Sequence, residues 1–414
     1  MTKANKKNNY IYSFIRTLIR AVARKILPIK KNQILFTSFG GQYSDSPKFI
    51  SEKIHAIAPS LKQVWLLKKQ NMNGIPDYIK IIDIDNQIKC FFYKATSQIL
   101  IDNVYAGNEI YLREQNLICE LMFKITRWAN TKQQFIFTTW HGTPLKKMGR
   151  DQIGNQILDF ECPNTNMILG NQYTLDTMKH LTFDKIKMTL LGTPRNDILF
   201  YSHSNLNDLK EKLKLPNDKK IILYAPTFRN DGLESEEKNV YRSGLNQLEE
   251  MNLGKLFQTL NRKFGGEWVL VCRFHYHVAS QVNWEMLSSQ YPGQIINGNL
   301  NGDMSEYLVI SDILLTDASS CMFDFALTKK PCFIYFPDLY NYEHIERGFY
   351  IPIETLPFKT AIDFESVLNN ISCFNKNEYV LSVDNMLRRF EYVDDAYSSE
   401  KVAKYILKQI KNIK

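Results

Sequence analysis

The sequence predicts an α/β protein of two domains, and three observations lead to that prediction. Short apolar runs with the composition of buried strands alternate with helix-type stretches along most of the chain. Polar, glycine-bearing segments directly follow several of these runs, as they do where parallel strands end at a ligand-binding edge. The alternation starts twice, at residues 33 and 221, in a chain of 414 residues that is long enough for more than one domain.

The composition is that of a globular protein, with 44% hydrophobic and 23% charged residues. No apolar run is long enough to span a bilayer. The seven cysteines are scattered without a CxxC pair, which is typical of reduced core residues in a cytosolic protein. The net charge is +9, and residues 1–31 alone hold nine Lys or Arg and no acidic residue. The remaining chain is therefore neutral overall, which argues against a nucleic-acid-binding surface.

Residues 1–31 are predicted to form a basic amphipathic helix. Apolar residues between Ile11 and Ile26 fall on one helical face, and Arg16, Arg20 and Arg24 step along the opposite side. A helix of this kind can lie in the interface of an anionic membrane, and we expect that association here. The alternative is a helix that packs its apolar face against the body of the protein.

The first domain is expected to cover residues 32–200. The apolar runs predict strands over 34–38, 64–67, 79–84, 99–102, 135–139 and 167–170, and a helix over 171–180. Gly40-Gly41 forms a turn after the first strand. The domain closes with the stretch 192–197, whose Arg195 supplies a fixed cation.

The most informative stretch of this domain is residues 139–151, which directly follows a strand. His141 has the side chain that titrates nearest neutral pH and is a candidate proton acceptor. Gly142 permits close approach of the backbone, and Pro144 is suited to the first turn of a helix. Lys146 and Lys147 add positive charge. The structural alternative is a strand-to-helix turn with a solvated basic face.

Residues 201–220 read as a linker, and the second domain is expected over 221–385. Strands are predicted over 221–225, 268–272, 294–296, 313–315 and 331–336, and helices over 253–264, 304–310 and 321–327. The polar stretch 230–244 is a surface loop or a lid. Residues 386–414 are predicted to form helices that pack back on the first domain.

The second domain carries a phosphate-type pattern. Ser319 and Ser320 follow a strand and start a helix, where backbone N–H groups and hydroxyls can bind an anion. Ordinary helix capping is the alternative. Arg273, His275 and Arg347 add further groups that can stabilise a diphosphate. His275 and His277 also have the spacing of a metal pair, but a third ligand is absent from the pattern, so no metal is expected.

These residues resemble a known family. The stretches 140–151 (WHGTPLKKMGRD), 192–197 (GTPRND), 224–229 (YAPTFR), 273–275 (RFH), 316–325 (TDASSCMFDF), 330–331 (KP) and 347–350 (RGFY) are similar to those of the CDP-glycerol glycerophosphotransferases of teichoic-acid and capsule assembly. The resemblance covers residues 34–350 and is to the short, primase-like form. It implies a GT-B architecture, in which two Rossmann-like domains face each other across a cleft.

The resemblance also implies a reaction and its residues. Glycerol phosphate would pass from CDP-glycerol to a hydroxyl of a lipid-linked acceptor, with release of CMP and no cofactor, on the inner face of the bacterial membrane. His141 and His275 would be catalytic. The donor would contact Arg273, His277, Thr316, Asp317, Ser319, Ser320 and Arg347. The acceptor or its phosphates would contact Gly142, Thr143, Lys146, Lys147, Asp151, Arg195 and Arg229. A homo-oligomer is left open.

Two departures from the family pattern matter. Tyr276 and a second histidine, His277, follow His275 where a proline is usual, so either histidine is a candidate for the diphosphate. Ala318 stands where tyrosine is frequent, which bears on the donor alcohol. Transfer of ribitol phosphate, sugar transfer on the same scaffold, and a non-catalytic membrane assembly factor are the competing functions.

Overall fold

The structure is a computed structural model that describes residues 27–72, 74–104, 134–152, 165–182, 186–201, 206–227, 243–274, 276–279 and 282–411. Several predictions lie outside these ranges: most of the basic N-terminal helix, Arg229, His275 and the stretch 230–242. Among the described helices, none combines the length and the apolar character needed to cross a bilayer.

The first half contains a seven-stranded parallel sheet in the order β3-β2-β1-β4-β5-β6-β7. Its strands are β1 (Lys30–Phe36), β2 (Lys62–Leu67), β3 (Ile79–Asp83), β4 (Ser97–Asp102), β5 (Phe135–Thr138), β6 (Thr165–Leu169) and β7 (Lys187–Leu190). The strand order reverses between β1 and β4, and ligands of such sheets bind beyond the carboxyl ends at this reversal.

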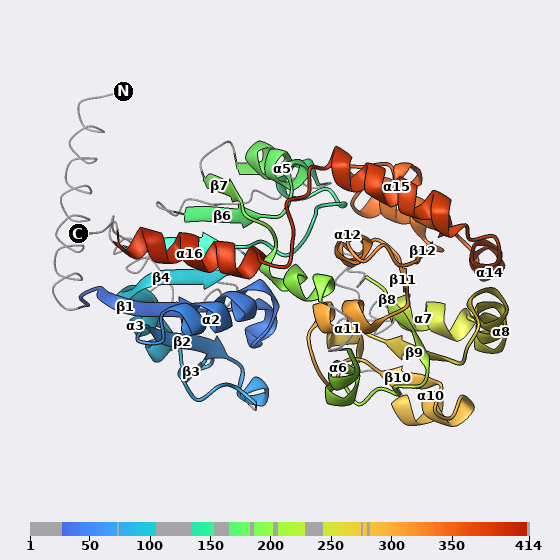
Figure 1. Cartoon of the computed structure of the whole chain (residues 1–414), viewed down its shortest axis with the longest axis horizontal. Helices are drawn as coiled ribbons and strands as arrows, with labels where there is room; N and C mark the ends of the chain where they lie inside the picture. Colours follow the sequence, from blue (N-terminus) through green and yellow to red (C-terminus); the bar gives the residue numbers. More distant parts are fainter. Residues whose placement is uncertain are drawn as a thin grey trace.

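The second half contains a six-stranded parallel sheet in the order β10-β9-β8-β11-β12-β13. Its strands are β8 (Lys220–Ala225), β9 (Trp268–Cys272), β10 (Ile295–Asn297), β11 (Ile313–Thr316), β12 (Cys332–Tyr335) and β13 (Lys359–Ala361). The reversal lies between β8 and β11. The two sheets lie in separate halves side by side (Figure 1). The predicted α/β class and the GT-B arrangement are confirmed.

Helices cover both sheets. The first half has α2 (Asp45–Ile57), α3 (Gln87–Thr96) and α5 (Gln172–Thr182). The second has α6 (Leu206–Lys212), α7 (Ser243–Glu250), α8 (Leu253–Phe264), α9 (Tyr276–Ala279), α10 (Trp284–Gln290), α11 (Met304–Ile310), α12 (Cys321–Ala326), α13 (Leu339–Asn341) and α14 (Phe364–Ser372). The helical turn 194–200 lies between the halves and contacts α2, α11 and α16.

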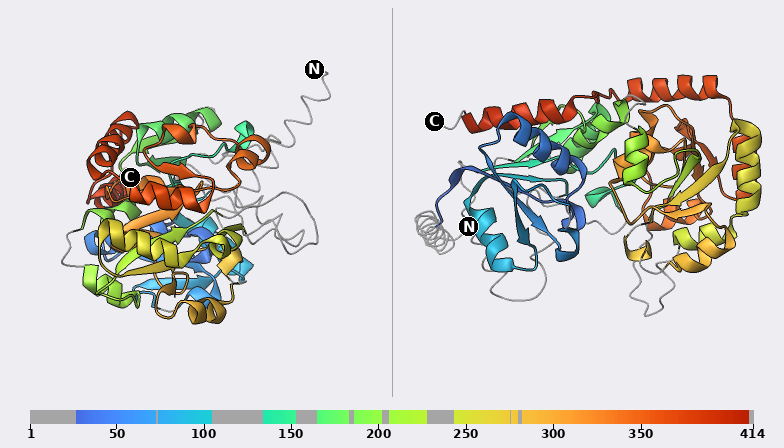
Figure 2. Two further views of the ribbon diagram at one scale, coloured as in Figure 1. Left: turned by 90° about the vertical axis from the view of Figure 1, so that its right-hand side faces the viewer. Right: turned by 60° about the horizontal axis from the view of Figure 1, so that its bottom comes forward.

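The last two helices connect the halves. Helix α15 (Lys376–Arg389) packs on the second half, where Val383 and Met386 join its core. Helix α16 (Ser398–Lys411) returns to the first half, where Val402, Ala403 and Ile406 join the core of its sheet beside α2. Figure 2 shows the two helices running along one side of the molecule, one over each half.

One local prediction is wrong. No helix starts at Pro144; residues 143–145 lack regular structure, and Lys146 forms an antiparallel bridge with Phe349 of the second half. The backbone pairing continues with Lys147 N donating to Gly348 O and Tyr350 N donating to Leu145 O. Leu145 is buried in the core of the second half. The basic stretch after His141 is therefore an interdomain strand-like segment, because its apolar residue and its backbone both find partners across the interface.

Candidate active site

A cleft with a volume of about 460 Å³ lies between the carboxyl edges of the two sheets. The first half contributes Phe39 after β1 and the stretch from Trp140 to Lys146 after β5. The second half contributes residues that follow β8, β9 and β11, together with Arg347. Both reversal points of strand order therefore open onto one cleft, which is where an α/β pair of this kind binds its ligands.

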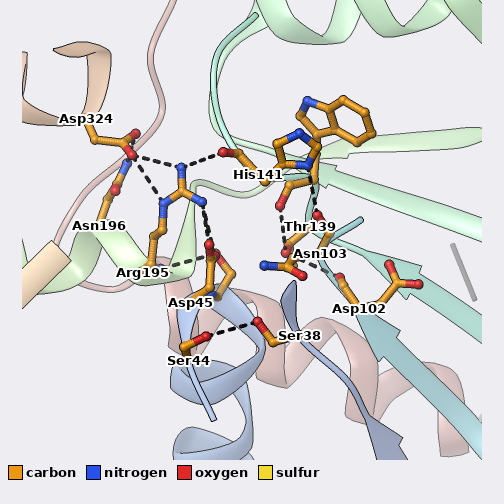
Figure 3. A network of polar contacts seen from close by, with 12 residues as sticks. Ser38, Ser44, Asp45, Asp102, Asn103, Thr139, His141, Arg195, Asn196 and Asp324 are labelled. Atoms are coloured by element: carbon orange, nitrogen blue, oxygen red, sulfur yellow. Dashed lines mark hydrogen bonds and ion pairs between the residues drawn. The ribbon is translucent and has the colours of Figure 1, made fainter. Parts of the chain in front are cut away.

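His141 lies on the wall of the first half. Its Nδ1 is 3.1 Å from the backbone oxygen of Asn103, which follows β4 (Figure 3). A carbonyl oxygen only accepts, so Nδ1 carries the proton in the neutral ring and Nε2 keeps its lone pair. The preceding residue, Trp140, has a left-handed backbone with φ of 54°. The strand therefore ends in an abrupt turn that presents the imidazole to the cleft.

The surroundings of His141 favour its neutral form. The pKa of His141 is lowered to about 4, mainly by burial and in addition by the positive charges of Arg195 and Lys146. The hydrogen bond to Asn103 and the charge of Asp45 act in the opposite direction but do not prevail. The ring is therefore uncharged at neutral pH, which is the protonation state that a proton acceptor requires.

Ser319 and Ser320 form the facing wall of the cleft, immediately before α12. Gly142 lies against them: a Cβ atom added to this glycine would be 2.6 Å from Ser320 Oγ. Its φ of 142° is a second reason for glycine, because other residues rarely adopt this conformation. The residue after the histidine thus lies directly beside Ser320, and the two predicted motifs meet.

Two arginines of the second half also line the cleft. Arg347 has a buried Nε atom without a hydrogen-bond partner in the described part of the chain. Arg273 is more constrained, since it donates to the carbonyl oxygens of Gly298 at 2.6 Å and Gly302 at 3.2 Å and lies over the Tyr307 ring. Arg347 is therefore the better placed of the two to bind an anion, and Arg273 also supports the loop beneath it.

Thr316 and Asp317 lie under the cleft rather than in its wall. Thr316 Oγ1 donates to Ala225 O at 2.6 Å, and Asp317 Oδ1 accepts from Thr227 N at 2.7 Å. Both side chains are fully buried. They join the ends of β8 and β11, so the structure favours a supporting role for these two predicted donor contacts.

The predicted acceptor residues divide into three groups. Gly142 and Lys146 line the cleft. Lys147 and Asp151 line a separate hollow with His180, and Asp151 Oδ2 accepts from Tyr350 OH at 2.9 Å. The third group, Thr143 and Arg195, is engaged by hydrogen bonds within the chain, and Thr143 also lines the cleft. Thr143 Oγ1 lies 2.7 Å from Tyr392 OH and accepts from Asn171 Nδ2 at 3.0 Å.

Several residues of the site region were not predicted from the sequence, among them Phe39, Asn103 and Asp324. Phe39 and Asn103 follow β1 and β4, so the rule that strand ends carry sites would have found both. Asp324 lies within α12 and binds Arg195, and no sequence signal reveals that pairing. Of the two histidines after β9, His275 lies outside the described residues, as does the side chain of His277. Among the residues that the structure describes, no three His, Cys, Asp or Glu side chains cluster as metal ligands would.

Comparison with known proteins adds to this geometry. Residues 19–408 match the protein family described as CDP-glycerol:poly(glycerophosphate) glycerophosphotransferase. The chain belongs to this family. It is 28% identical to the teichoic acid poly(glycerol phosphate) polymerase of Staphylococcus epidermidis over 92% of this chain and 51% of the polymerase. It is 26% identical to the teichoic acid glycerol-phosphate transferase of Staphylococcus aureus over 91% of this chain and 93% of the transferase.

Comparison with solved structures supports the fold. The wall teichoic acid polymerase TagF, in its H548A variant, superposes with a TM-score of 0.75 at 25% identity, over 100% of this chain and 99% of that chain. The chain spans about half the length of the first curated relatives it matches, at 51% and 52%. The family and the fold are thereby established, and the resemblance seen in the motifs is confirmed.

Proposed function

We propose that the chain transfers glycerol phosphate from CDP-glycerol to a hydroxyl group of an acceptor and releases CMP. The main support for this proposal is that neutral His141 faces Ser319, Ser320 and Arg347 across one cleft, in a chain that belongs to this family. Relatives named as a glycerol-phosphate transferase and as poly(glycerol phosphate) polymerases support this donor.

In the proposed reaction the acceptor oxygen attacks the phosphorus atom that carries glycerol. A P–O bond forms to the acceptor, the P–O bond to CMP breaks, and CMP leaves with that electron pair. The acceptor proton passes to Nε2 of His141, which is the unprotonated nitrogen because Nδ1 faces the Asn103 carbonyl. A positioned base typically contributes ~10²–10⁴-fold to such a step.

The donor diphosphate belongs to the wall of the second half. Ser319 and Ser320 offer hydroxyl donors, and Arg347 offers a charged donor whose Nε lacks a partner in the described part of the chain. Fixed donors of this kind stabilise negative charge that develops during phosphoryl transfer. Arg273, His275 and His277 remain predicted donor contacts, as Arg229 remains a predicted phosphate contact.

The acceptor is proposed to be a lipid-linked saccharide or polyol phosphate of teichoic-acid or capsule assembly. Residues 1–31, with nine basic and no acidic residues, would hold the enzyme on the inner face of a bacterial membrane. Each basic residue near an anionic surface contributes roughly 1 kcal/mol to that attraction. Lys146 in the cleft would meet an anionic acceptor.

CDP-ribitol is a second candidate donor, favoured by one feature of the cleft. Ala318 lies at the wall where the family often has tyrosine, so a smaller side chain stands beside the serine pair, a difference that bears on the donor alcohol. A relative named as a teichoic acid ribitol-phosphate primase, from Bacillus spizizenii, is 26% identical over 92% of this chain and 92% of the primase.

The deciding experiment offers the protein CDP-glycerol, CDP-ribitol and nucleotide sugars in parallel, each with a lipid-linked acceptor analogue. CMP release from CDP-glycerol in preference to CDP-ribitol supports the proposal. Release of a nucleoside diphosphate from a nucleotide sugar would assign sugar transfer instead. If no nucleotide were released from any donor, the result would favour a non-catalytic assembly factor.

A further inference from the structure

Arg195 lies between the two halves, in the helical turn 194–200, and is 7% exposed. Its guanidinium donates to Asp324 from Nε at 3.2 Å and from Nη2 at 2.8 Å, and to both carboxylate oxygens of Asp45 from Nη1 at 3.1 and 2.9 Å. Nη2 also donates to the backbone oxygen of His141 at 3.1 Å (Figure 3). All three nitrogens are therefore used within the chain, which leaves little capacity for a phosphate.

These partners come from three different parts of the site. His141 is the proposed base of the first half. Asp45 starts α2 with a left-handed backbone, φ of 59°. Asp324 belongs to α12, the helix that follows Ser320 directly and on whose N-terminal side the serine pair lies. The Arg195 side chain thus binds both the turn that contains His141 and helix α12, which directly follows Ser319 and Ser320.

The turn at His141 needs such support. Trp140 is in the left-handed region, which non-glycine residues hold only when their surroundings impose it. The ring of His141 is fixed through Nδ1 by the Asn103 carbonyl, and its backbone oxygen is fixed by Arg195. Both the ring and the backbone of His141 are therefore fixed by hydrogen bonds. Only the bond from Arg195 depends on the second half of the molecule, because Arg195 is also bound to Asp324.

We propose that Arg195 is a positioning residue that holds His141 in the correct position relative to Ser319 and Ser320. In this proposal it does not contact the acceptor or a phosphate. The inference rests on the proposed function, in which His141 is the base and the serine wall binds the donor. In this role, the buried side chain of Arg195 aligns His141 on one side of the cleft with Ser319 and Ser320 on the other.

The test compares Arg195→Ala with Lys48→Met. Lys48 forms the matched interdomain ion pair, from α2 to Asp303 at 2.8 Å and Glu306 at 3.8 Å in the second half, without touching His141. A base displaced by about 1 Å costs on the order of 10²-fold, so kcat of Arg195→Ala should fall by roughly that factor. The KM for CDP-glycerol should change by less than about threefold, because the donor contacts remain. Lys48→Met should keep kcat within about threefold, and added guanidinium ion should partly restore Arg195→Ala.

A second readout does not depend on turnover. The ¹⁵N resonances of the His141 ring report its tautomer and its titration. Arg195 and Lys146 oppose protonation of the ring and Asp45 favours it, so loss of Arg195 should raise the titration midpoint. If wild-type protein released no CMP, the proposed function would fail while this measurement still tested the positioning role.

Two results would overturn the inference. One is an equal loss of kcat in Arg195→Ala and Lys48→Met, which would reduce Arg195 to an ordinary interdomain contact. The other is an unchanged His141 spectrum and midpoint in folded Arg195→Ala. If that variant does not fold, Asp324→Asn is used in its place, since it weakens the link to α12 and leaves the bonds to Asp45 and His141. It should lower kcat with KM unchanged, and no loss would equally refute the role.

Discussion

Replacing Gly142 with alanine tests whether the contact between the two cleft walls sets the reacting geometry. The added Cβ would lie 2.6 Å from Ser320 Oγ, 3.0 Å from Ser320 Cβ and 3.4 Å from Arg195 Nη2. Non-bonded atoms prefer about 3.5–4.0 Å, so the walls must separate by roughly 1 Å or the turn must rotate. A misplacement of that size can cost about 10²-fold in rate.

The expected result is a fall in kcat of about two orders of magnitude. The strained backbone should also lower the free energy of unfolding by about 1–3 kcal/mol. CMP release at saturating donor measures the first quantity, and denaturant unfolding measures the second. Gly74→Ala is the matched control. It also replaces a glycine with positive φ, 70°, but no atom lies within 4 Å of the added Cβ. It should lose stability and keep kcat.

Full activity in Gly142→Ala would refute the argument, because it would mean that the walls can separate without consequence. A loss in Gly74→Ala as large as in Gly142→Ala would also refute it. In that case backbone strain anywhere in the first half, and not the contact with Ser320, would explain the loss.

The remaining predictions concern His141, the buried Asp394 and the basic N-terminal segment. His141→Ala should lower turnover by at least ~10²-fold with thermal stability unchanged, measured by CMP release and calorimetry; near-normal release would remove His141 from the role of base. Burial lowers the pKa of His141 to about 4, so activity should persist below pH 6. It should fall only near pH 4, where the ring becomes protonated. The unfolded chain takes up this proton near its ordinary pKa of about 6.5, so the same group makes the folded state less stable as pH drops from there towards 4, which unfolding at several pH values would show. Burial raises the pKa of Asp394 to about 7, so its charge opposes folding increasingly above its ordinary pKa, and Asp394→Asn should stabilise the protein more at pH 8 than at pH 5. Protein lacking residues 1–29, a deletion that leaves β1 intact, should lose binding to anionic vesicles while retaining activity on a soluble acceptor analogue; persistent vesicle binding would contradict the membrane role.

The sequence was sufficient for the central strands and for most of the cleft. Strands such as β8 and β9 are continuous apolar runs because they are buried on both faces, and that pattern is visible without a structure. The edge strands β7 and β13 were missed, since they are short, begin with lysine and are partly exposed. His141 and Ser320 were found because both follow strands and therefore reach the same edge.

Interdomain pairings could not be predicted in the same way. For Arg195 the family resemblance implies a contact with the acceptor or its phosphates, and nothing near it in the sequence indicates its partners within the chain. Its actual partners, Asp45 and Asp324, are 150 and 129 positions away in the sequence. Pro144 misled for a related reason: its local preference favours a helix start, but the segment gains more by pairing with residues 348–350 and burying Leu145 across the interface.

These pairings bear on how the cleft works. Separating the halves would break the backbone bonds between 145–147 and 348–350 and the buried Arg195–Asp324 pair. Each backbone hydrogen bond contributes roughly 0.5–1.5 kcal/mol net, so the pairing between these segments opposes separation of the halves. His141 and the serine pair, Ser319 and Ser320, therefore already face each other in the structure. Preassembly is what stabilisation of charge by fixed donors requires, because groups already in place need no reorganisation when the phosphoryl group moves.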